Sequence, residues 1–223
     1  MKKKYLFSTV LLLFLISCDL KSASDYFNMA SRLETQGDIK GAIKLLDQAI
    51  EKDPKYLPAY INRGVDKALL GDYRSAIADY NSVIKIAPAN TLALFNRAKN
   101  EERLQNYLAA IDDLGRAINS KGGENLTIDL RQDSPIENGA EYDVPSGEIR
   151  FERAFIFYKI GNLRKAYQDL NACISQNYQM CPCLRMRGSI YLAYGKKEQG
   201  MNDLREAVML GDTAALRMYN QTR

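Results

Sequence analysis

The chain has 223 residues, 26% of them charged, a formal net charge of +4 at pH 7, no histidine and no tryptophan. Without histidine it lacks the commonest general base and zinc ligand, and every Ser-His-Asp or Cys-His arrangement. The charge is close to balanced, so nothing in it points to nucleic acid as a partner. We therefore expect no enzyme activity, no bound metal and no cofactor.

The N-terminal residues have the pattern of a secretion signal. Lys2 to Lys4 form a basic start, and residues 5–16 form a mostly apolar run that is shorter than the about 20 residues needed to span a bilayer. The run ends in Leu-Ile-Ser-Cys18, which resembles the lipobox of bacterial lipoproteins. The resemblance implies removal of residues 1–17, a lipid such as palmitate on Cys18, and a tether over residues 18–24. The choice between inner and outer membrane stays open.

The rest of the chain repeats with a step of 34 residues. Ala42, Ala76 and Ala110 keep this step, as do Pro54 and Pro88. A break falls in the middle of each unit, at Gly37, Gly71, Gln105, Gly161 and Gly195. The next residue is Asp38, Asp72, Asn106 or Asn162 in four units, with Lys196 as the exception. This pattern predicts two helices per unit: a residue in the left-handed conformation closes the first, and an acid or amide caps the second.

The step and its punctuation resemble the tetratricopeptide repeat (TPR), a helix–turn–helix unit. The resemblance implies an all-α fold, a right-handed superhelix of about five repeats with a capping helix and one insertion loop. Stacked units bury each other's apolar stripes. We expect units one to three in residues 25–119, an acidic insertion loop with a short strand at 126–130 in residues 120–147, and units four and five with the capping helix in residues 148–223.

An arginine precedes an aspartate by 16 residues in four of the five units. The pairs are Arg63 and Asp79, Arg97 and Asp113, Arg153 and Asp169, and Arg187 and Asp203. In the first unit both members are replaced, by Met29 and Leu45. Joint replacement predicts a structural ion pair that closes within each unit. The alternative is a ladder of arginines that grips an anionic ligand.

Three further cysteines, Cys173, Cys181 and Cys183, lie close together in the sequence. An exported protein meets oxidising conditions, so Cys173 is a candidate for a disulfide with Cys181 or Cys183. A bridge within the Cys-Pro-Cys segment would be strained. The alternative is that all three thiols pack as small apolar groups.

Function is then expected at a surface. In TPR arrays the first helices line a concave groove that receives peptides or extended protein segments. The groove positions carried over to this chain are Phe27, Asn28, Ser31, Ile61, Asn62, Val65, Phe95, Asn96, Lys99, Phe151, Phe155, Tyr158, Arg185 and Ser189.

The leading hypothesis is a lipid-anchored scaffold of the bacterial cell envelope that binds protein or peptide, of the class that serves envelope assembly or recruits peptidoglycan enzymes. The alternative is a lipoprotein that captures a glycan or a small molecule, although the absence of tryptophan weakens it for sugars. Self-association through the ends of the array is a third hypothesis.

Overall fold

The computed structural model describes residues 20–120 and 144–223, and within these ranges every regular element is an α-helix. The helices are α1 (Ala23–Thr35), α2 (Ile39–Lys52), α3 (Leu57–Leu69), α4 (Tyr73–Ile86), α5 (Thr91–Arg103), α6 (Tyr107–Asn119), α7 (Ser146–Lys159), α8 (Leu163–Ser175), α9 (Met180–Ala193), α10 (Lys197–Met209) and α11 (Thr213–Thr222). Cys18 and the strand expected at residues 126–130 lie outside the described residues.

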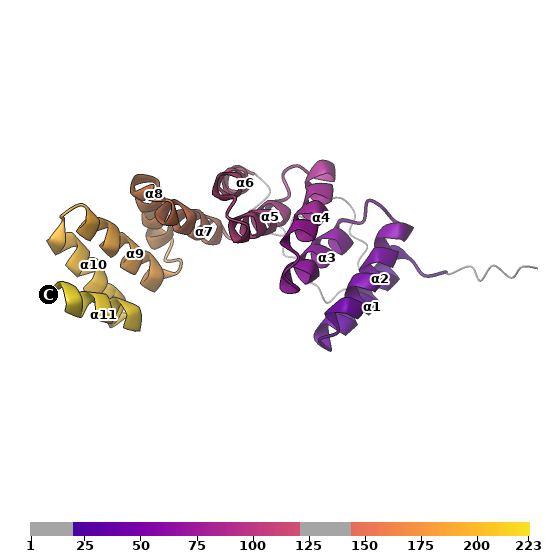
Figure 1. The fold of residues 1–223 in the computed structure, drawn as a ribbon, viewed down its shortest axis with the longest axis horizontal. Coiled ribbons are helices and arrows are strands. Elements are labelled where there is room, and N and C mark those ends of the chain that lie inside the picture. The colour runs from indigo at the N-terminus through magenta and orange to yellow at the C-terminus, as the bar shows by residue number, and fades with distance from the viewer. Residues whose placement is uncertain (1–19, 121–143) are drawn as a thin grey trace, which may run out of the picture.

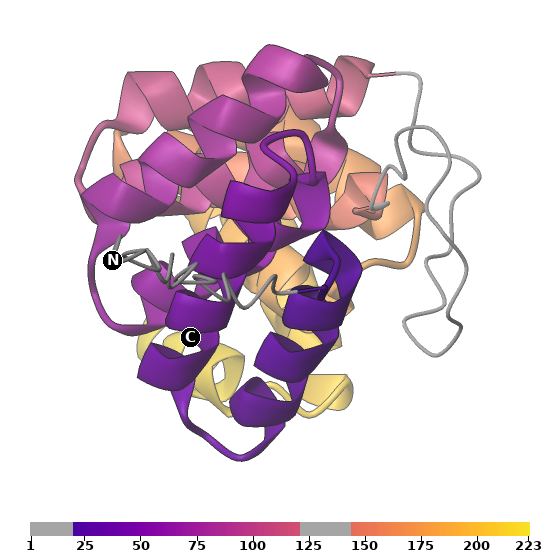
Figure 2. The same cartoon turned by 90° about the vertical axis from the view of Figure 1, so that its right-hand side faces the viewer.

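Consecutive helices form five antiparallel hairpins, and α11 covers the last one. Figure 1 shows the hairpins stacked one after another along the long axis, from α1 and α2 at one end to α10 and α11 at the other. Viewed along the stack in Figure 2, the helices overlap in a wound arrangement. Each helix packs on the one before it in the sequence. The predicted all-helical repeat array with a capping helix is confirmed.

The turns within the hairpins follow the sequence pattern, with one difference. Gly71 and the equivalent glycines of units one, four and five have φ between 72° and 81°, and Gln105 takes the same left-handed conformation at 63°. Asp72 accepts a hydrogen bond from the Ser75 amide at 3.2 Å, which caps α4. Asn106 was expected to cap α6 in the same way, but its side-chain amide donates to a Glu101 carboxylate oxygen at 2.6 Å instead.

In the part of the chain that the structure describes, the core consists of four apolar clusters along the stack, and one of them extends from units two and three into α7. The repeated alanines Ala42, Ala76 and Ala110 are completely buried, and their small side chains let paired helices approach closely. Val144, from the end of the insertion, is buried in the same cluster as Leu114 of α6. The insertion therefore separates units three and four in sequence but does not separate their apolar surfaces. In the described ranges 20–120 and 144–223, no helix has the length and apolar character of a membrane span.

Candidate functional site

The candidate site is the surface of the first helices of the hairpins, α1, α3, α5, α7 and α9, here called the first-helix surface. The prediction of an accessible residue on this surface is wrong at two positions. Ile61 and Phe95 are only 2% and 4% exposed and belong to the core, where they pack between neighbouring units. Phe155 and Tyr158 of α7 are 42% and 37% exposed, so their rings are available to a partner.

An aromatic and charged cluster spans units three and four on this surface. The ammonium of Lys159 donates to a Glu102 carboxylate oxygen at 2.8 Å and lies 5.9 Å from the centre of the Phe155 ring. The hydrogen bond to Glu102 raises the pKa of Lys159. Lys99 is exposed and lies 5.2 Å from the Phe95 ring centre. The cluster thus offers an accessible aromatic ring beside charges of both signs.

The opposite end of the first-helix surface, in units one and two, is apolar and acidic. Val65 and Leu69 of α3 are exposed. Asn62 donates weakly to both carboxylate oxygens of Glu34, at 3.4 and 3.5 Å. Beside them lies Asp66, which is 2% exposed.

Asp66 is an unusual member of this region. Its Oδ2 atom is buried and has no hydrogen-bond partner. Burial, assisted by the nearby Glu34 charge, raises the pKa of Asp66 to about 7. The sequence held a signal for this position: at the repeat spacing Asp66 is followed by Asn100, Ile156 and Ile190, all of them buried.

Other expected members of the site have partners within the protein. Arg185 forms an ion pair with Asp212, whose side chain also caps α11. The Ser189 hydroxyl donates to the Arg185 carbonyl at 2.9 Å. The Phe27 ring packs edge-on against Tyr56 with 5.7 Å between the ring centres.

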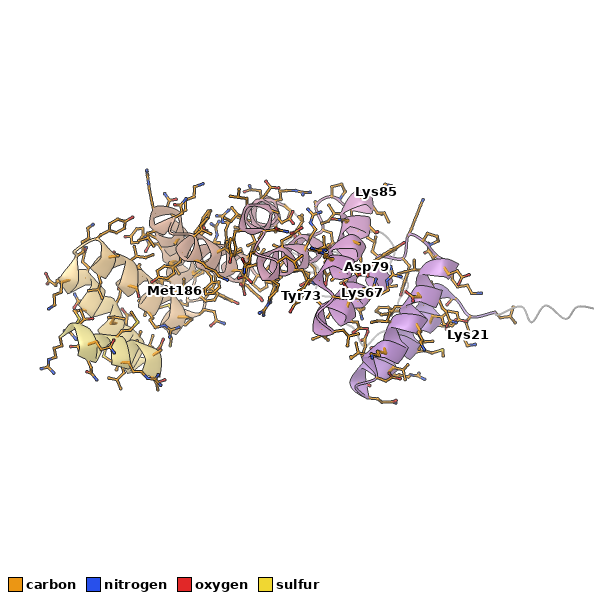
Figure 3. The ribbon with its side chains drawn as sticks, viewed as in Figure 1. Lys21, Lys67, Tyr73, Asp79, Lys85 and Met186 are labelled. Carbon is orange, nitrogen blue, oxygen red and sulfur yellow. The ribbon has the colours of Figure 1, made fainter. Side chains whose placement is uncertain are left out.

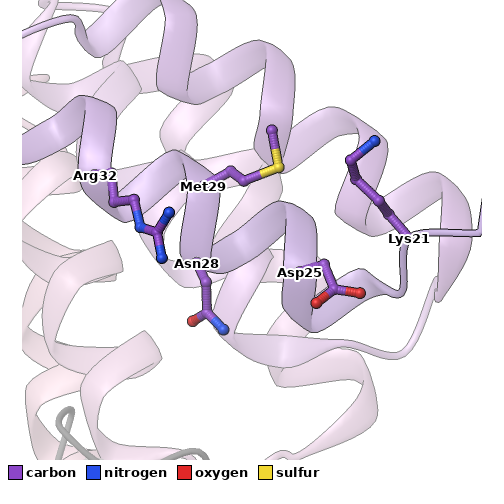
Figure 4. A pocket seen from close by; sticks show the side chains of 5 residues that line it. All are labelled: Lys21, Asp25, Asn28, Met29 and Arg32. Carbon is purple, nitrogen blue, oxygen red and sulfur yellow. The ribbon is translucent and has the colours of Figure 1, made fainter.

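The remaining members differ in accessibility. Asn28 is exposed and lines a shallow open pocket of about 270 Å³ on α1, shown in Figure 4 together with Lys21, Asp25, Met29 and Arg32. Ser31, Asn96 and Phe151 are half-buried, and Phe151 packs against the core of unit four. Of these four residues, only Asn28 is fully accessible to a partner.

The structure brings together all four arginine–aspartate pairs. Arg97 holds Asp113 with two hydrogen bonds, from Nε at 2.7 Å and Nη2 at 2.5 Å, and the carboxylate is buried. The other three arginines make the same two-point contact within their own units. In Figure 3, Asp79 lies close to Lys67, whose ammonium is 2.8 Å from the same carboxylate.

Three of these arginines have a second partner that sequence reasoning missed. Nη1 of Arg63 donates to Asp47 at 2.6 Å, that of Arg97 to Asn81 at 2.5 Å, and that of Arg187 to Asn171 at 2.8 Å. These acceptors lie 16 residues before the arginine, in the second helix of the preceding unit. We call each acceptor–arginine–aspartate set a rung. Before Arg153 the acceptor position is Gly115, whose missing Cβ would lie 3.6 Å from Nη1.

The three described cysteines are free thiols. Cys173 and Cys183 are completely buried in the core of unit four. Cys181 is half-buried and donates to the Leu210 carbonyl at 3.5 Å. Within residues 20–120 and 144–223, no three acidic or cysteine side chains are grouped so that they could hold a metal ion.

Comparison with known proteins supports the class of fold. Residues 57–90 match the tetratricopeptide repeat family model. The chain is similar to YrrB, described as a TPR protein with an unusual peptide-binding site, with a TM-score of 0.68 and 18% identity over 89% of this chain and 92% of that one. The TM-score to MamA from Desulfovibrio magneticus RS-1 is also 0.68, with 13% identity over 84% and 94% of the two chains.

A third solved structure, a thermophilic TPR protein from Thermus thermophilus named TTC0263, covers 90% of this chain and 98% of its own at 13% identity, with a TM-score of 0.54. Comparison with curated proteins gave no match. At these identities the similarity shows the fold alone. The chain therefore has the fold of a tetratricopeptide repeat array.

Proposed function

We propose that this protein is a non-enzymatic scaffold that binds a protein or peptide segment along its first-helix surface. The observation that carries the proposal is the exposed apolar side chains on that surface, Val65, Leu69, Phe155 and Tyr158. Aromatic anchors of this kind dominate the energetics of protein interfaces. The peptide-binding site named for YrrB, which has the same fold, supports the proposal.

The charges around Phe155 give such a contact its specificity. Lys99 and Lys159 can pair with acidic groups of a partner, and Glu102 can accept from its basic groups. Because all three lie near the surface, each ion pair with a partner would contribute about 1 kcal/mol or less. The aromatic rings would supply most of the affinity, and the charges would select among partners.

A crosslinking experiment tests the scaffold function. A photoreactive amino acid is placed at Tyr158 and, as a matched control, at Leu108, an 80% exposed apolar residue on α6, a second helix. In living cells we expect discrete crosslinked bands from position 158 and none from 108, with loss of the bands in a Phe155→Ala background. Equal crosslinking from both positions would contradict a specific first-helix surface.

We also propose that the scaffold is a lipoprotein of a bacterial cell envelope, anchored through Cys18 after removal of residues 1–17. The support is the sequence pattern: a basic start, a short apolar run and a lipobox-like end at the correct spacing. Cys18→Ala is expected to abolish lipid labelling and leave the chain unprocessed or released from membranes. Normal processing and an unchanged membrane fraction would argue against the anchor.

A further inference from the structure

The turn between α8 and α9 differs from the other links between units. The link before α5 contains a proline and the capping residue Asn90, whose side chain accepts from the Ala93 amide at 2.8 Å. The link at residues 176–179 contains neither proline nor glycine. Two of its residues, Asn177 and Gln179, have φ values of 54° and 46°, and α9 starts without a side-chain cap. Such left-handed non-glycine residues are costly and need support from their surroundings.

Two cysteines flank this turn and lie in one buried apolar cluster beneath it. Cys173 lies in the last turn of α8 and Cys183 in the first turn of α9, and both are 0% exposed. The Cys173 thiol donates to the Gly147 carbonyl at 3.4 Å, and the Cys183 thiol donates to the Tyr178 carbonyl at 3.5 Å. Both side chains belong to the same buried apolar cluster in unit four, and each thiol influences the pKa of the other.

The surroundings make the two thiols unequal. Contact with Cys183 lowers the pKa of Cys173, whereas contact with Cys173, together with burial, raises the pKa of Cys183. Burial and the Asp169 charge raise the pKa of Cys173, and the Arg150 charge lowers it; the Nε atom of Arg150 is buried without a hydrogen-bond partner. Because the thiolate is the nucleophile in disulfide exchange, Cys173 is the residue that attacks first.

We propose that Cys173 and Cys183 are a redox pair and form a disulfide that closes the α8–α9 turn when the protein folds under oxidising conditions. The oxidant is a protein or small-molecule disulfide. The Cys173 thiolate attacks one of its sulfurs and releases the first thiolate; Cys183 loses its proton and attacks the Cys173 sulfur of the mixed disulfide, which releases the second. The oxidant gains two electrons and becomes two thiols, and the two protein thiols supply their protons.

Cys181 is the competing partner, and the structure disfavours it. Its thiol is directed to the Leu210 carbonyl at the end of α10 and lies outside the cluster that contains the other two sulfurs. A bridge between Cys181 and Cys183 would have to close across a single proline with strained geometry. The sequence left the choice between Cys181 and Cys183 open, and the side-chain packing selects Cys183.

The test uses the full chain with Cys18→Ser, so that only the three described cysteines compete. The protein is unfolded, reduced and refolded with a mixture of oxidised and reduced glutathione, because the native thiols are buried. Residues 166–185 contain no lysine or arginine before Arg185, so trypsin leaves all three cysteines on one peptide. Chymotrypsin cuts after Tyr178 and separates Cys173 from the others, so the two halves stay joined only if a disulfide links them.

Serine variants then identify the partner. We expect the refolded Cys181→Ser chain to lose two hydrogens by intact mass, like the parent chain, and to unfold at a higher urea concentration than its reduced form. Cys173→Ser and Cys183→Ser should keep all their thiols. Complete oxidation of Cys183→Ser would assign the bond to Cys181 and overturn the proposal. The proposal would also be overturned if the chymotryptic digest of the refolded parent chain contained no disulfide-linked pair of peptides. This measurement does not depend on whether any variant folds.

Discussion

The two halves of the array, units two and three on one side of the insertion and units four and five on the other, share their arginine–aspartate pairs but differ at one buried position. Each of these units holds a buried aspartate with a two-point arginine contact. At the position of Asp66, the first half continues with Asn100, whereas the second half has Ile156 and Ile190. All four side chains are buried.

The comparison distinguishes a feature that recurs along the repeat, the rungs, from a feature of one unit, the buried Asp66. The rungs occur on both sides of the insertion, which identifies them with the stacking of units and not with one binding site. The buried position is satisfied in different ways: the Asn100 amide donates to the Asn96 carbonyl at 2.7 Å, and the isoleucines need no partner. Asp66 has an unpaired buried oxygen and a pKa near neutral pH, so of these four units only unit two titrates at this position.

The largest predicted effect is the loss of an arginine from a rung. Arg97→Met leaves the Asp113 carboxylate buried without its main partner, which we expect to cost about 3–5 kcal/mol in the free energy of unfolding. Arg187→Met should cost a similar amount, because its rung has the same geometry in the other half. Urea denaturation of both variants measures the two losses, and a large loss in one half only would show that the rungs are not equivalent.

The first unit supplies the control, since Met29 and Leu45 occupy the two positions there. Arg97→Met combined with Asp113→Leu should recover much of the loss seen in Arg97→Met alone. A double-mutant cycle gives the coupling directly. Additive losses would mean that the side chains do not stabilise each other, and the arginines would again be candidates for binding an anion.

The second prediction concerns pH. The pKa of Asp66 is about 7 in the folded chain and the ordinary carboxyl value is 3.8, so the folded state binds the proton more tightly. Stability from this group is therefore complete at acid pH and is lost as the pH rises from about 4 to 7. Asp66→Asn should be more stable than the parent at pH 8 by about 1–3 kcal/mol, the cost of an unsatisfied buried group, with little difference at pH 4.

Urea unfolding midpoints of the two chains, measured from pH 4 to 8, test this effect. The difference between them, and not either curve alone, isolates Asp66 from the other carboxylates. Asn100→Asp is a useful partner experiment, because it should introduce a similar pH dependence in unit three. A constant difference between the parent and Asp66→Asn across the range would contradict the raised pKa.

The sequence predicted the array because its signals are local and repeated. The helical turns follow from Gly71 and its equivalents, and the within-unit contact of Arg97 with Asp113 follows from a spacing of 16 residues seen four times. The accessibility of single residues could not be predicted in the same way. Ile61 and Phe95 occupy groove positions of the repeat, but local superhelical packing buries them.

Side-chain contacts between different units also could not be predicted from the sequence of one unit alone. Arg185 was expected to face a ligand, but it pairs with Asp212, the residue that caps α11. The outer acceptors of the rungs, such as Asn81, become visible only when neighbouring units are compared. The burial of Asp66 beside Glu34 depends on how α1 packs against α3, which no local pattern specifies.

The third prediction repairs the incomplete rung between the halves. Gly115→Asn places an amide where Asn81 stands in the preceding unit, beside Arg153 Nη1, with enough room for the added Cβ. A new hydrogen bond and the removal of a helical glycine should together stabilise the chain by about 1 kcal/mol. Gly115→Ala is the control for helix propensity, since alanine gains the most helical stability without a side-chain acceptor. An asparagine variant less stable than the alanine variant by about 0.6 kcal/mol would mean that no rung forms.

The smallest change in stability is expected from replacing most of the insertion. Val144, near its end, is the residue of the insertion that we expect to stabilise the fold. We predict that replacing residues 121–143 with a shorter Gly/Ser linker changes the free energy of unfolding by about 0.6 kcal/mol or less, because the cost of closing a loop grows slowly with its length. Val144→Ala should cost more, about 1.5 kcal/mol, because it removes two buried carbons from the cluster that joins α6 to the next unit. Circular dichroism and urea unfolding of both variants compare the two. If the linker variant lost more stability than Val144→Ala, the two halves would depend on the insertion for their packing, and the apolar cluster shared by α6 and α7 would not be sufficient to hold them together.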